Sequence, residues 1–266
     1  MSIKNFIYNH SFGWSPLPFH LTMNISNICN RSCVICPYHS KEISENWYSK
    51  WWKAQPKLMD FNKFADMLKR MGLLRHWIKQ IAITGKGEPL LHPEFLKFCR
   101  EVNRYKIAFS ITTNGDNLFP SLCRELAKLE YLSYVRISVY DYDLKNFWLE
   151  KQKTAYIPIW LYNETGRHID GMVDGFVLYT NPGTEKYCTV PKDFVTAKTC
   201  SVPFSFNTLN TDGSLVPCYA FFETGNVFTI PFWKVINSEQ MRHFRKKALV
   251  MQAPTSNCKN CGYFLK

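Results

Sequence analysis

Apolar runs alternate with amphipathic segments along the first two thirds of the chain. Six of these runs have the length and the β-branched or aromatic content that is typical of strands. They lie at 20–26, 77–84, 107–113, 134–140, 156–162 and 175–180. The shortness of each run predicts strands that are buried within a sheet rather than long helices.

Amphipathic segments between these runs are predicted to be helices. The first follows Asp60, a typical N-cap, and its apolar residues recur on one helical face. Others are predicted at 93–104, with Pro93 in the first turn, at 122–129 and at 144–151. Alternating strands and helices favour a parallel sheet. We therefore predict an α/β fold, an incomplete TIM-type barrel of six units, that is, a partial (β/α)6 barrel.

The last third of the chain has a different pattern. Cys200 and Cys218 flank a predicted β-hairpin at 204–217, whose two-residue turn signal is Asp212-Gly213. A basic helix near 238–249 follows, and the pair Cys258 and Cys261 lies near the end. We predict a barrel domain at 1–184 and a small α+β domain at 185–266.

Composition places further limits on the protein. The chain has 266 residues, of which 46% are hydrophobic, enough to bury a sizeable core. No run approaches the roughly 18 apolar residues of a membrane span, and the first residues lack the features of a signal peptide. We expect a cytoplasmic protein with no membrane partner. In that reducing compartment we do not expect its ten cysteines to form disulfides, and the clustered ones are typical of metal or catalytic positions.

The charge balance favours acidic partners. The chain has 33 Lys and Arg against 21 Asp and Glu, a formal net charge of +12. Such a charge suits a phosphorylated metabolite, a carboxylate or an acidic redox protein. No motif of a nucleic-acid-binding module accompanies it. We therefore expect most of these charges on solvated helix faces, and we do not expect a nucleic-acid partner.

Unusual residues lie after three consecutive predicted strands and near the end of the fourth, and the chemistry of barrels is carried at these carboxyl ends. Two glycines that flank Lys86 allow a close approach of the backbone to a ligand, and Glu88 adds a carboxylate suited to an ammonium group. The four positions hold Cys29, Cys33 and Cys36; Gly85, Gly87 and Glu88; Asn114; and Ser138.

The two sets of cysteines suit metal sites. The triplet Cys29, Cys33 and Cys36 can hold three irons of a four-iron, four-sulfur cluster and leave the fourth iron open. Alternatively, His39 would complete a zinc site with these three thiolates. The four tail cysteines similarly suit either an iron-sulfur cluster or a closed zinc site.

The CxxxCxxC spacing of the triplet, followed by Gly85-Lys-Gly-Glu-Pro, resembles the radical S-adenosylmethionine (SAM) enzymes. The resemblance implies that a 4Fe-4S cluster on the triplet cleaves SAM reductively to a 5'-deoxyadenosyl radical. It also implies that Gly85, Gly87 and Glu88 contact the methionine amino group of SAM. Asn114 and Ser138 would contact its ribose or carboxylate.

The tail is similar to the twitch, or short SPASM, auxiliary-cluster domain, including Gly213 shortly before Cys218. The resemblance implies one auxiliary 4Fe-4S cluster, hence two clusters in all, and a flavodoxin- or ferredoxin-type reductant. With four protein ligands the auxiliary cluster would accept an electron from a substrate radical. Its ligands would be Cys200, Cys218, Cys258 and Cys261.

Three functions are compatible with this sequence. Similarity to compact aminocyclitol dehydrogenases favours a radical SAM oxidoreductase that acts on a small molecule. The positive net charge of the chain is compatible with an anionic substrate. A peptide or protein maturase is the alternative enzyme, and a zinc-binding basic adaptor protein is the non-enzymatic alternative. Cys188 is a candidate hydrogen or proton donor, whereas Cys99 and Cys123 are expected to be core residues.

Overall fold

A computed structural model describes residues 11–15, 19–33, 36, 38–39, 41, 54–139, 159–163, 179–180, 200, 202–217, 224–250 and 252. These residues form an eight-stranded sheet with the strand order β6-β5-β4-β3-β2-β1-β7-β8. The boundary predicted at residue 184 and the helix predicted at 144–151 lie outside the described residues.

The six predicted barrel strands are confirmed, and neighbouring strands among them pair in parallel. Their bounds differ by a few residues from those expected from the sequence. They are β1 (Phe19–Asn24), β2 (Ile78–Thr84), β3 (Phe109–Thr113), β4 (Leu132–Val139), β5 (Ile159–Asn163) and β6 (Tyr179–Thr180). Their carboxyl ends therefore meet at one edge of the sheet, as the partial barrel requires.

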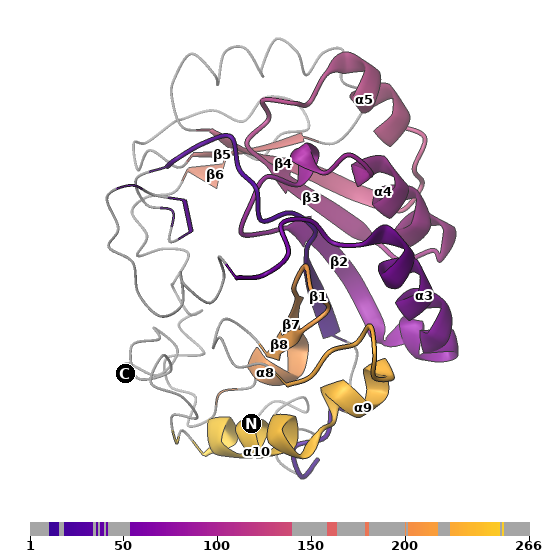
Figure 1. Ribbon diagram of the computed structural model, residues 1–266, viewed down its shortest axis with the longest axis vertical. Coiled ribbons are helices and arrows are strands. Elements are labelled where there is room, and N and C mark those ends of the chain that lie inside the picture. Colours follow the sequence, from indigo (N-terminus) through magenta and orange to yellow (C-terminus); the bar gives the residue numbers. More distant parts are fainter. Residues whose placement is uncertain are drawn as a thin grey trace.

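Helices α3 (Phe61–Met71), α4 (Phe95–Arg104) and α5 (Pro120–Leu126) cover one face of this sheet (Figure 1). The Asp60 carboxylate caps α3 by accepting from the backbone N–H groups of Asn62 and Lys63, as predicted. Short 3-10 helices, η1 (Gly72–Trp77) and η2 (Pro89–Leu91), flank β2. Trp77, predicted to begin the second strand, is the last residue of η1. The helix predicted from residue 93 begins at Phe95, because residues 93–94 form a turn.

The two faces of the sheet differ in polarity. Successive strand residues point to opposite faces. Leu21, Ile81 and Ile111 pack into the hydrophobic core with residues of α3 and α4. The alternate positions on the opposite face, the inner face of the partial barrel, include Thr22, Ser110, Thr112, Arg136 and Ser138. The barrel therefore has an apolar outside beneath the helices and a polar inside.

The predicted hairpin extends the barrel sheet instead of standing apart from it. Strand β7 (Phe206–Leu209) pairs in parallel with β1 and antiparallel with β8 (Leu215–Pro217). Phe204 belongs to the short helix α8 (Val202–Ser205), so the hairpin begins later than predicted. The Asn210 N–H donates to the Ser214 carbonyl, which leaves a three-residue loop. Gly213 has φ 90° in this loop, so the turn signal was correct although the loop is one residue longer.

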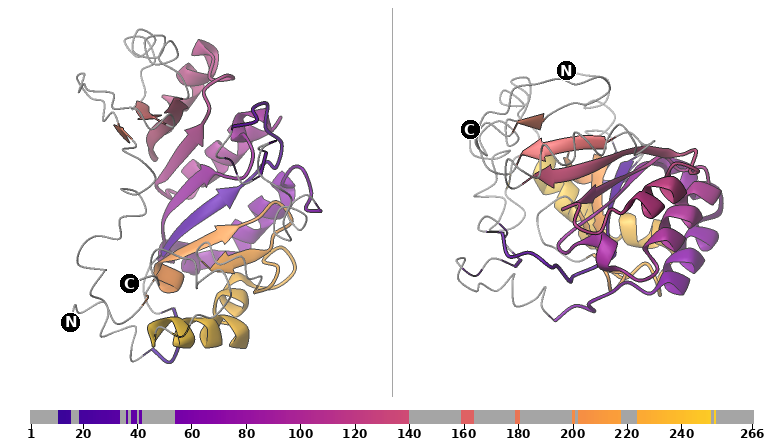
Figure 2. Two further views of the ribbon diagram at one scale, coloured as in Figure 1. Left: turned by 90° about the vertical axis from the view of Figure 1, so that its left-hand side faces the viewer. Right: turned by 90° about the horizontal axis from the view of Figure 1, so that it is seen from above.

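The loop after β1 that holds Cys29, Cys33 and Cys36 is called the cysteine loop below. Helices α9 (Phe232–Ile236) and α10 (Glu239–Leu249) lie at the opposite end of the sheet (Figure 2). Arg245 of α10 is fully buried, which corrects the expectation that its charge is solvated. Its guanidinium donates to the carbonyls of Pro203, Ile236 and Gly13, at 3.1, 2.7 and 3.2 Å. Arg245 thus joins α10 to the segments around α8 and α9.

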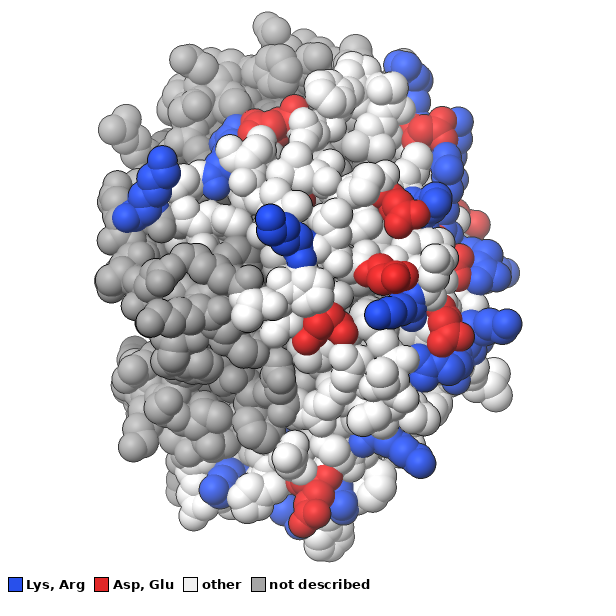
Figure 3. All heavy atoms as spheres, in the orientation of Figure 1, with Lys and Arg blue, Asp and Glu red and all other residues white. Residues whose placement is uncertain are grey.

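Charges of both signs mix over α3, α4 and α5 on the surface seen in Figure 3. They form exposed pairs within or between these helices, such as Arg70 with Asp66 and Arg100 with Glu125. This part of the charge distribution is a solvated helix surface, as predicted. Cys99 and Cys123 are buried in the core, also as predicted. No helix in the described parts of the chain has the length and apolar character needed to cross a lipid bilayer.

Candidate active site

A pocket opens at the carboxyl ends of β1 to β4. It is lined by the cysteine triplet and by every residue that the sequence nominated for binding SAM. The lining residues are Cys29, Arg31, Cys33, Cys36, His39, Thr84, Gly85, Lys86, Gly87, Glu88, Thr112, Thr113, Asn114 and Ser138. The parallel strands therefore bring together groups that are spread over more than one hundred positions of the sequence.

Backbone hydrogen bonds shape the cysteine loop after β1. The Arg31 N–H donates to Cys29 Sγ and the His39 N–H to Cys36 Sγ, both at 3.4 Å. Burial raises the pKa of the Cys29 thiol, and the nearby Glu88 and the other two thiols of the triplet raise it further. N–H donors directed at sulfur stabilise thiolates, the form in which cysteine binds iron.

The three thiols of the cysteine loop line one pocket, together with Gly85, Gly87 and Glu88. Backbone N–H groups donate to two of the three sulfurs. Three thiols facing one pocket are a donor set that fits a four-iron cluster with one open iron.

The loop after β2 that contains Gly85, Gly87 and Glu88, called the glycine loop below, packs tightly against the end of β1. A Cβ atom on Gly87 would lie 2.5 Å from the carbonyl oxygens of Ile28 and Ser26, and one on Gly85 would collide with the Asn24 side chain. The Glu88 N–H donates to the Ile28 carbonyl at 2.7 Å. Only glycine fits these two positions, and the loop is thereby held beside the cysteine loop.

Glu88 is buried beneath the pocket, with 3% of its surface exposed. Its carboxylate accepts from the Thr113 hydroxyl at 2.6 Å, from the Asn114 N–H at 2.7 Å and from the Leu90 N–H at 3.0 Å. Burial raises the Glu88 pKa, and these three bonds partly offset that rise. Glu88 thus organises the loop after β3, and its oxygens retain lone pairs for one further donor.

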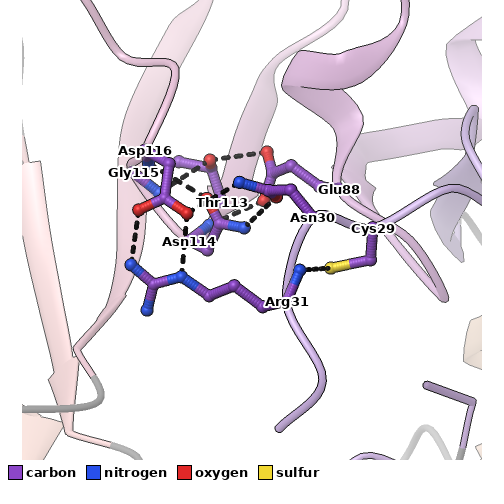
Figure 4. A network of polar contacts seen from close by, with 8 residues as sticks. All are labelled: Cys29, Asn30, Arg31, Glu88, Thr113, Asn114, Gly115 and Asp116. Carbon is purple, nitrogen blue, oxygen red and sulfur yellow. Dashed lines mark hydrogen bonds and ion pairs between the residues drawn. The ribbon is translucent and has the colours of Figure 1, made fainter.

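Figure 4 shows a polar network that sequence reasoning did not find. Arg31 and Asn30, inside the cysteine loop, both donate to the Asp116 carboxylate. The Asn114 amide donates to Asn30 Oδ1 at 2.8 Å. The signal in the sequence was present: Arg31 and Asp116 carry opposite charges on two strand-end loops that meet at one edge of the sheet.

The tail cysteines are described only in part. Cys200 is buried, and its N–H donates to the Ala248 carbonyl near the end of α10 at 3.0 Å. Cys218, Cys258 and Cys261, and the candidate donor Cys188, lie outside the described residues. The ligand set of an auxiliary cluster therefore stays a prediction.

Comparison with known families defines the class of protein. Residues 23–152 match the radical SAM superfamily. This part of the chain is a radical SAM domain, and it includes the cysteine loop, the glycine loop and strands β2 to β4. Residues 200–262 match SPASM, an iron-sulfur cluster-binding domain, so the tail is an auxiliary-cluster domain.

Curated relatives match only over parts of their length. A tungsten-containing aldehyde ferredoxin oxidoreductase cofactor-modifying protein of Pyrococcus furiosus is 30% identical over 110 residues, 41% of this chain and 28% of that protein. A probable GTP 3',8-cyclase of Pyrococcus horikoshii is 26% identical over 128 residues, 48% of this chain and 36% of that protein. The matched segment thus spans about a third of each relative.

Solved structures share the fold over nearly the whole chain. BtrN in complex with AdoMet and 2-DOIA has a TM-score of 0.67 at 17% identity, covering 93% of this chain and 94% of BtrN. Streptococcus suis SuiB bound to S-adenosylmethionine has a TM-score of 0.56 at 15% identity, covering 98% of this chain and 74% of SuiB. These likenesses confirm the partial-barrel fold.

Proposed function

We propose that this protein is a radical SAM oxidoreductase that removes two electrons from a polar organic substrate. The observation that carries the proposal is the single pocket shared by the cysteine triplet, the glycine loop, Glu88, Asn114 and Ser138. These residues come from four strand ends. Their types match the two needs of SAM cleavage: thiolates that bind a cluster, and hydrogen-bond donors and acceptors that bind the amino-acid part of SAM.

When bound, a four-iron cluster with one open iron and SAM supply an electron and a 5'-deoxyadenosyl radical, which removes a hydrogen atom from the substrate. The substrate then loses one electron and one proton. The electron that enters to cleave SAM is balanced by the electron that leaves the substrate. A flavodoxin- or ferredoxin-type protein is the proposed source of the first electron.

The chain's own residues would bind and orient these groups. Cys29, Cys33 and Cys36 would ligate the cluster. Gly85 and Gly87 allow the glycine loop to pack against the cysteine loop, which would place its backbone polar groups beside the methionine amino group, while Glu88 supplies an acceptor beneath it. Asn114 and Ser138 are proposed to contact the ribose or carboxylate.

The polar inner face of the barrel supports a polar substrate. Thr112 and Ser138 line the pocket, and Thr112 pairs in register with Arg136 on the neighbouring strand. Hydroxyls and a guanidinium on this face suit a hydroxylated or anionic small molecule better than an apolar one. We therefore prefer small-molecule dehydrogenation as the reaction. A substrate screen in which peptides react and small molecules do not would indicate peptide modification instead.

The auxiliary cluster is proposed to accept the electron from the substrate. Its ligands would be Cys200, Cys218, Cys258 and Cys261, giving two 4Fe-4S clusters in the protein. The match of 200–262 to an iron-sulfur cluster-binding domain supports this assignment. Four protein ligands leave no open iron, which suits electron transfer rather than substrate binding.

The first test counts iron, acid-labile sulfide and zinc on anaerobically reconstituted protein. About eight irons in the wild type and about four in a variant with Cys29, Cys33 and Cys36 replaced by alanine would support two four-iron clusters. About four irons and one zinc in the wild type would make the tail structural, and the electron-acceptor role would be wrong.

The second test measures 5'-deoxyadenosine formed from SAM with a chemical reductant. The triple cysteine variant should form none. Replacing Cys258 and Cys261 by alanine should retain part of this SAM cleavage while abolishing substrate oxidation. Equal loss of both activities would contradict electron acceptance by the tail and would indicate a structural role.

A further inference from the structure

Lys86 reaches from the glycine loop to the hairpin of the auxiliary-cluster domain. Its Nζ donates a 2.8 Å hydrogen bond to Asn210 Oδ1, and only 8% of Lys86 and 1% of Asn210 are exposed. Asn210 follows β7 and lies within the segment that matches the cluster-binding domain. Because β1 lies between β2 and β7, this side chain crosses the carboxyl end of β1.

A second chain of hydrogen bonds runs in parallel. The Lys86 N–H donates to Asn24 Oδ1 at 3.0 Å, and the Asn24 amide donates to Asn27 Oδ1 at 2.7 Å. The Asn27 amide in turn donates to the Thr211 hydroxyl at 2.9 Å. Asn27 stands two residues before Cys29. The glycine loop, the cysteine loop and the hairpin therefore share one buried network.

The hairpin connects the Lys86 charge to a carboxylate. The Asn210 amide donates to Ser214 Oγ at 3.0 Å, and Ser214 Oγ donates to Asp212 Oδ1 at 2.7 Å. A buried ammonium is costly unless it is hydrogen-bonded and its charge is balanced. The hairpin supplies a hydrogen-bonding partner to Lys86 and thereby links the glycine loop to the auxiliary-cluster domain.

We propose that Lys86 is a positioning residue that couples the SAM-binding loop to the auxiliary-cluster domain through Asn210. This inference rests on the proposed function, because it assigns the glycine loop to SAM. The Lys86–Asn210 bond adds to the packing and the hydrogen bonds that hold Gly85, Gly87 and Glu88 in their binding positions. The auxiliary domain thus forms part of the SAM site as well as carrying its own cluster.

The test compares Lys86→Met, Asn210→Leu and the double variant as reconstituted holoenzymes. Each single variant should raise the KM for SAM in 5'-deoxyadenosine formation by about tenfold, which corresponds to a loss of about 1.4 kcal/mol. It should weaken the SAM-induced change in the EPR spectrum of the reduced cluster to the same extent. Iron content should stay at the wild-type value.

The double variant separates positioning from stability. Each single variant breaks the Lys86–Asn210 bond at one end, whereas replacing both residues by apolar side chains removes both polar groups of that bond. Because Asn210→Leu and the double variant both lose the Asn210 bond to Ser214, the double variant should have a higher unfolding midpoint as apoprotein than Asn210→Leu, while keeping the raised KM for SAM. Recovery of the KM together with the midpoint would overturn the proposal and make the bond purely structural.

Lys79→Met provides the matched control, because Lys79 is exposed on β2, the strand that precedes the glycine loop. Its KM for SAM should equal that of the wild type. A KM in Lys86→Met that matches Lys79→Met would also overturn the proposal. Failure of the proposed function has a different signature, because the wild type itself would then form no 5'-deoxyadenosine and show no change in its EPR spectrum with SAM.

Discussion

Arg31 and Asp116 form an ion pair that ties the cysteine loop to the loop after β3. The Arg31 Nε donates to Asp116 Oδ2 at 2.8 Å, and its Nη2 contacts Oδ1. Asn30 donates to the same carboxylate. Because Arg31 lies between Cys29 and Cys33, this pair holds the middle of the cysteine loop, which no metal ligand would fix by itself.

The Arg31–Asp116 pair makes stability depend on pH. The hydrogen bond from Arg31 holds the Asp116 pKa below its usual range. The contribution of Asp116 is complete above the unfolded-state pKa of about 3.9 and is lost as the pH falls through the lower folded-state pKa. Asp116→Asn should lower the free energy of unfolding of the apoprotein by up to about 1 kcal/mol near neutral pH, since the pair is partly exposed.

Urea unfolding at a series of pH values checks this prediction. The wild type and Asp116→Asn should converge as the pH falls below the usual aspartate range. Glu94→Gln is the control, since Glu94 pairs with Lys97 on the exposed surface of α4 and should contribute less. A difference between wild type and Asp116→Asn that stays constant with pH would contradict the assignment.

The Thr113 hydroxyl supports the Glu88 carboxylate. Thr113→Val removes the 2.6 Å bond to Glu88 and should destabilise the apoprotein by about 1.5–3 kcal/mol, the range for hydrogen bonds to charged groups. It should also raise the Glu88 pKa further, because this bond is one of those that lower it. Carbon-13 NMR titration of the Glu88 carboxyl measures the shift, and an unchanged pKa would rule out the contact.

Gly87 is restricted by close packing. Gly87→Ala places a Cβ 2.5 Å from two carbonyl oxygens of the cysteine loop and should cost about 1–3 kcal/mol of stability through overpacking. SAM cleavage should fall because the loop must move. Gly72→Ala is the comparison, since its Cβ meets no atom within 4 Å while its φ of 53° strains the backbone. It should lose stability but keep the KM for SAM.

Asn114 and Ser138 should behave differently although both line the pocket. Asn114 Nδ2 donates to Asn30, and Asn114 Oδ1 accepts from the Asp116 N–H at 3.0 Å. Asn114→Ala should therefore reduce both stability and SAM affinity. Ser138→Ala should reduce SAM affinity by up to about tenfold, the value of one hydrogen bond, with stability nearly unchanged. Thermal unfolding and SAM titration by EPR distinguish the two, and equal stability losses would argue against the assignment.

Local patterns predicted elements well where one physical rule dominates. The Asp60 cap, the apolar face of α3 and the buried strands follow from side-chain spacing and hydrogen bonding within a few residues. The hairpin loop was predicted one residue too short, because Asp212-Gly213 indicates a turn without determining its length. Arg245 was expected in solvent, since no local pattern shows that the carbonyls of Pro203, Ile236 and Gly13 converge on it.

The sequence by itself determined the α/β alternation, the cysteine spacing and the glycine loop, because these depend on neighbouring residues and on chemistry that specific residue types must supply. Only the tertiary structure decided that β7 joins β1 in the barrel sheet, that Arg31 meets Asp116 and that Lys86 reaches Asn210. Lys86 and Asn210 are 124 positions apart in the chain. Contacts at such separations arise from strand order, which brings distant strand ends to one edge and which no short segment encodes.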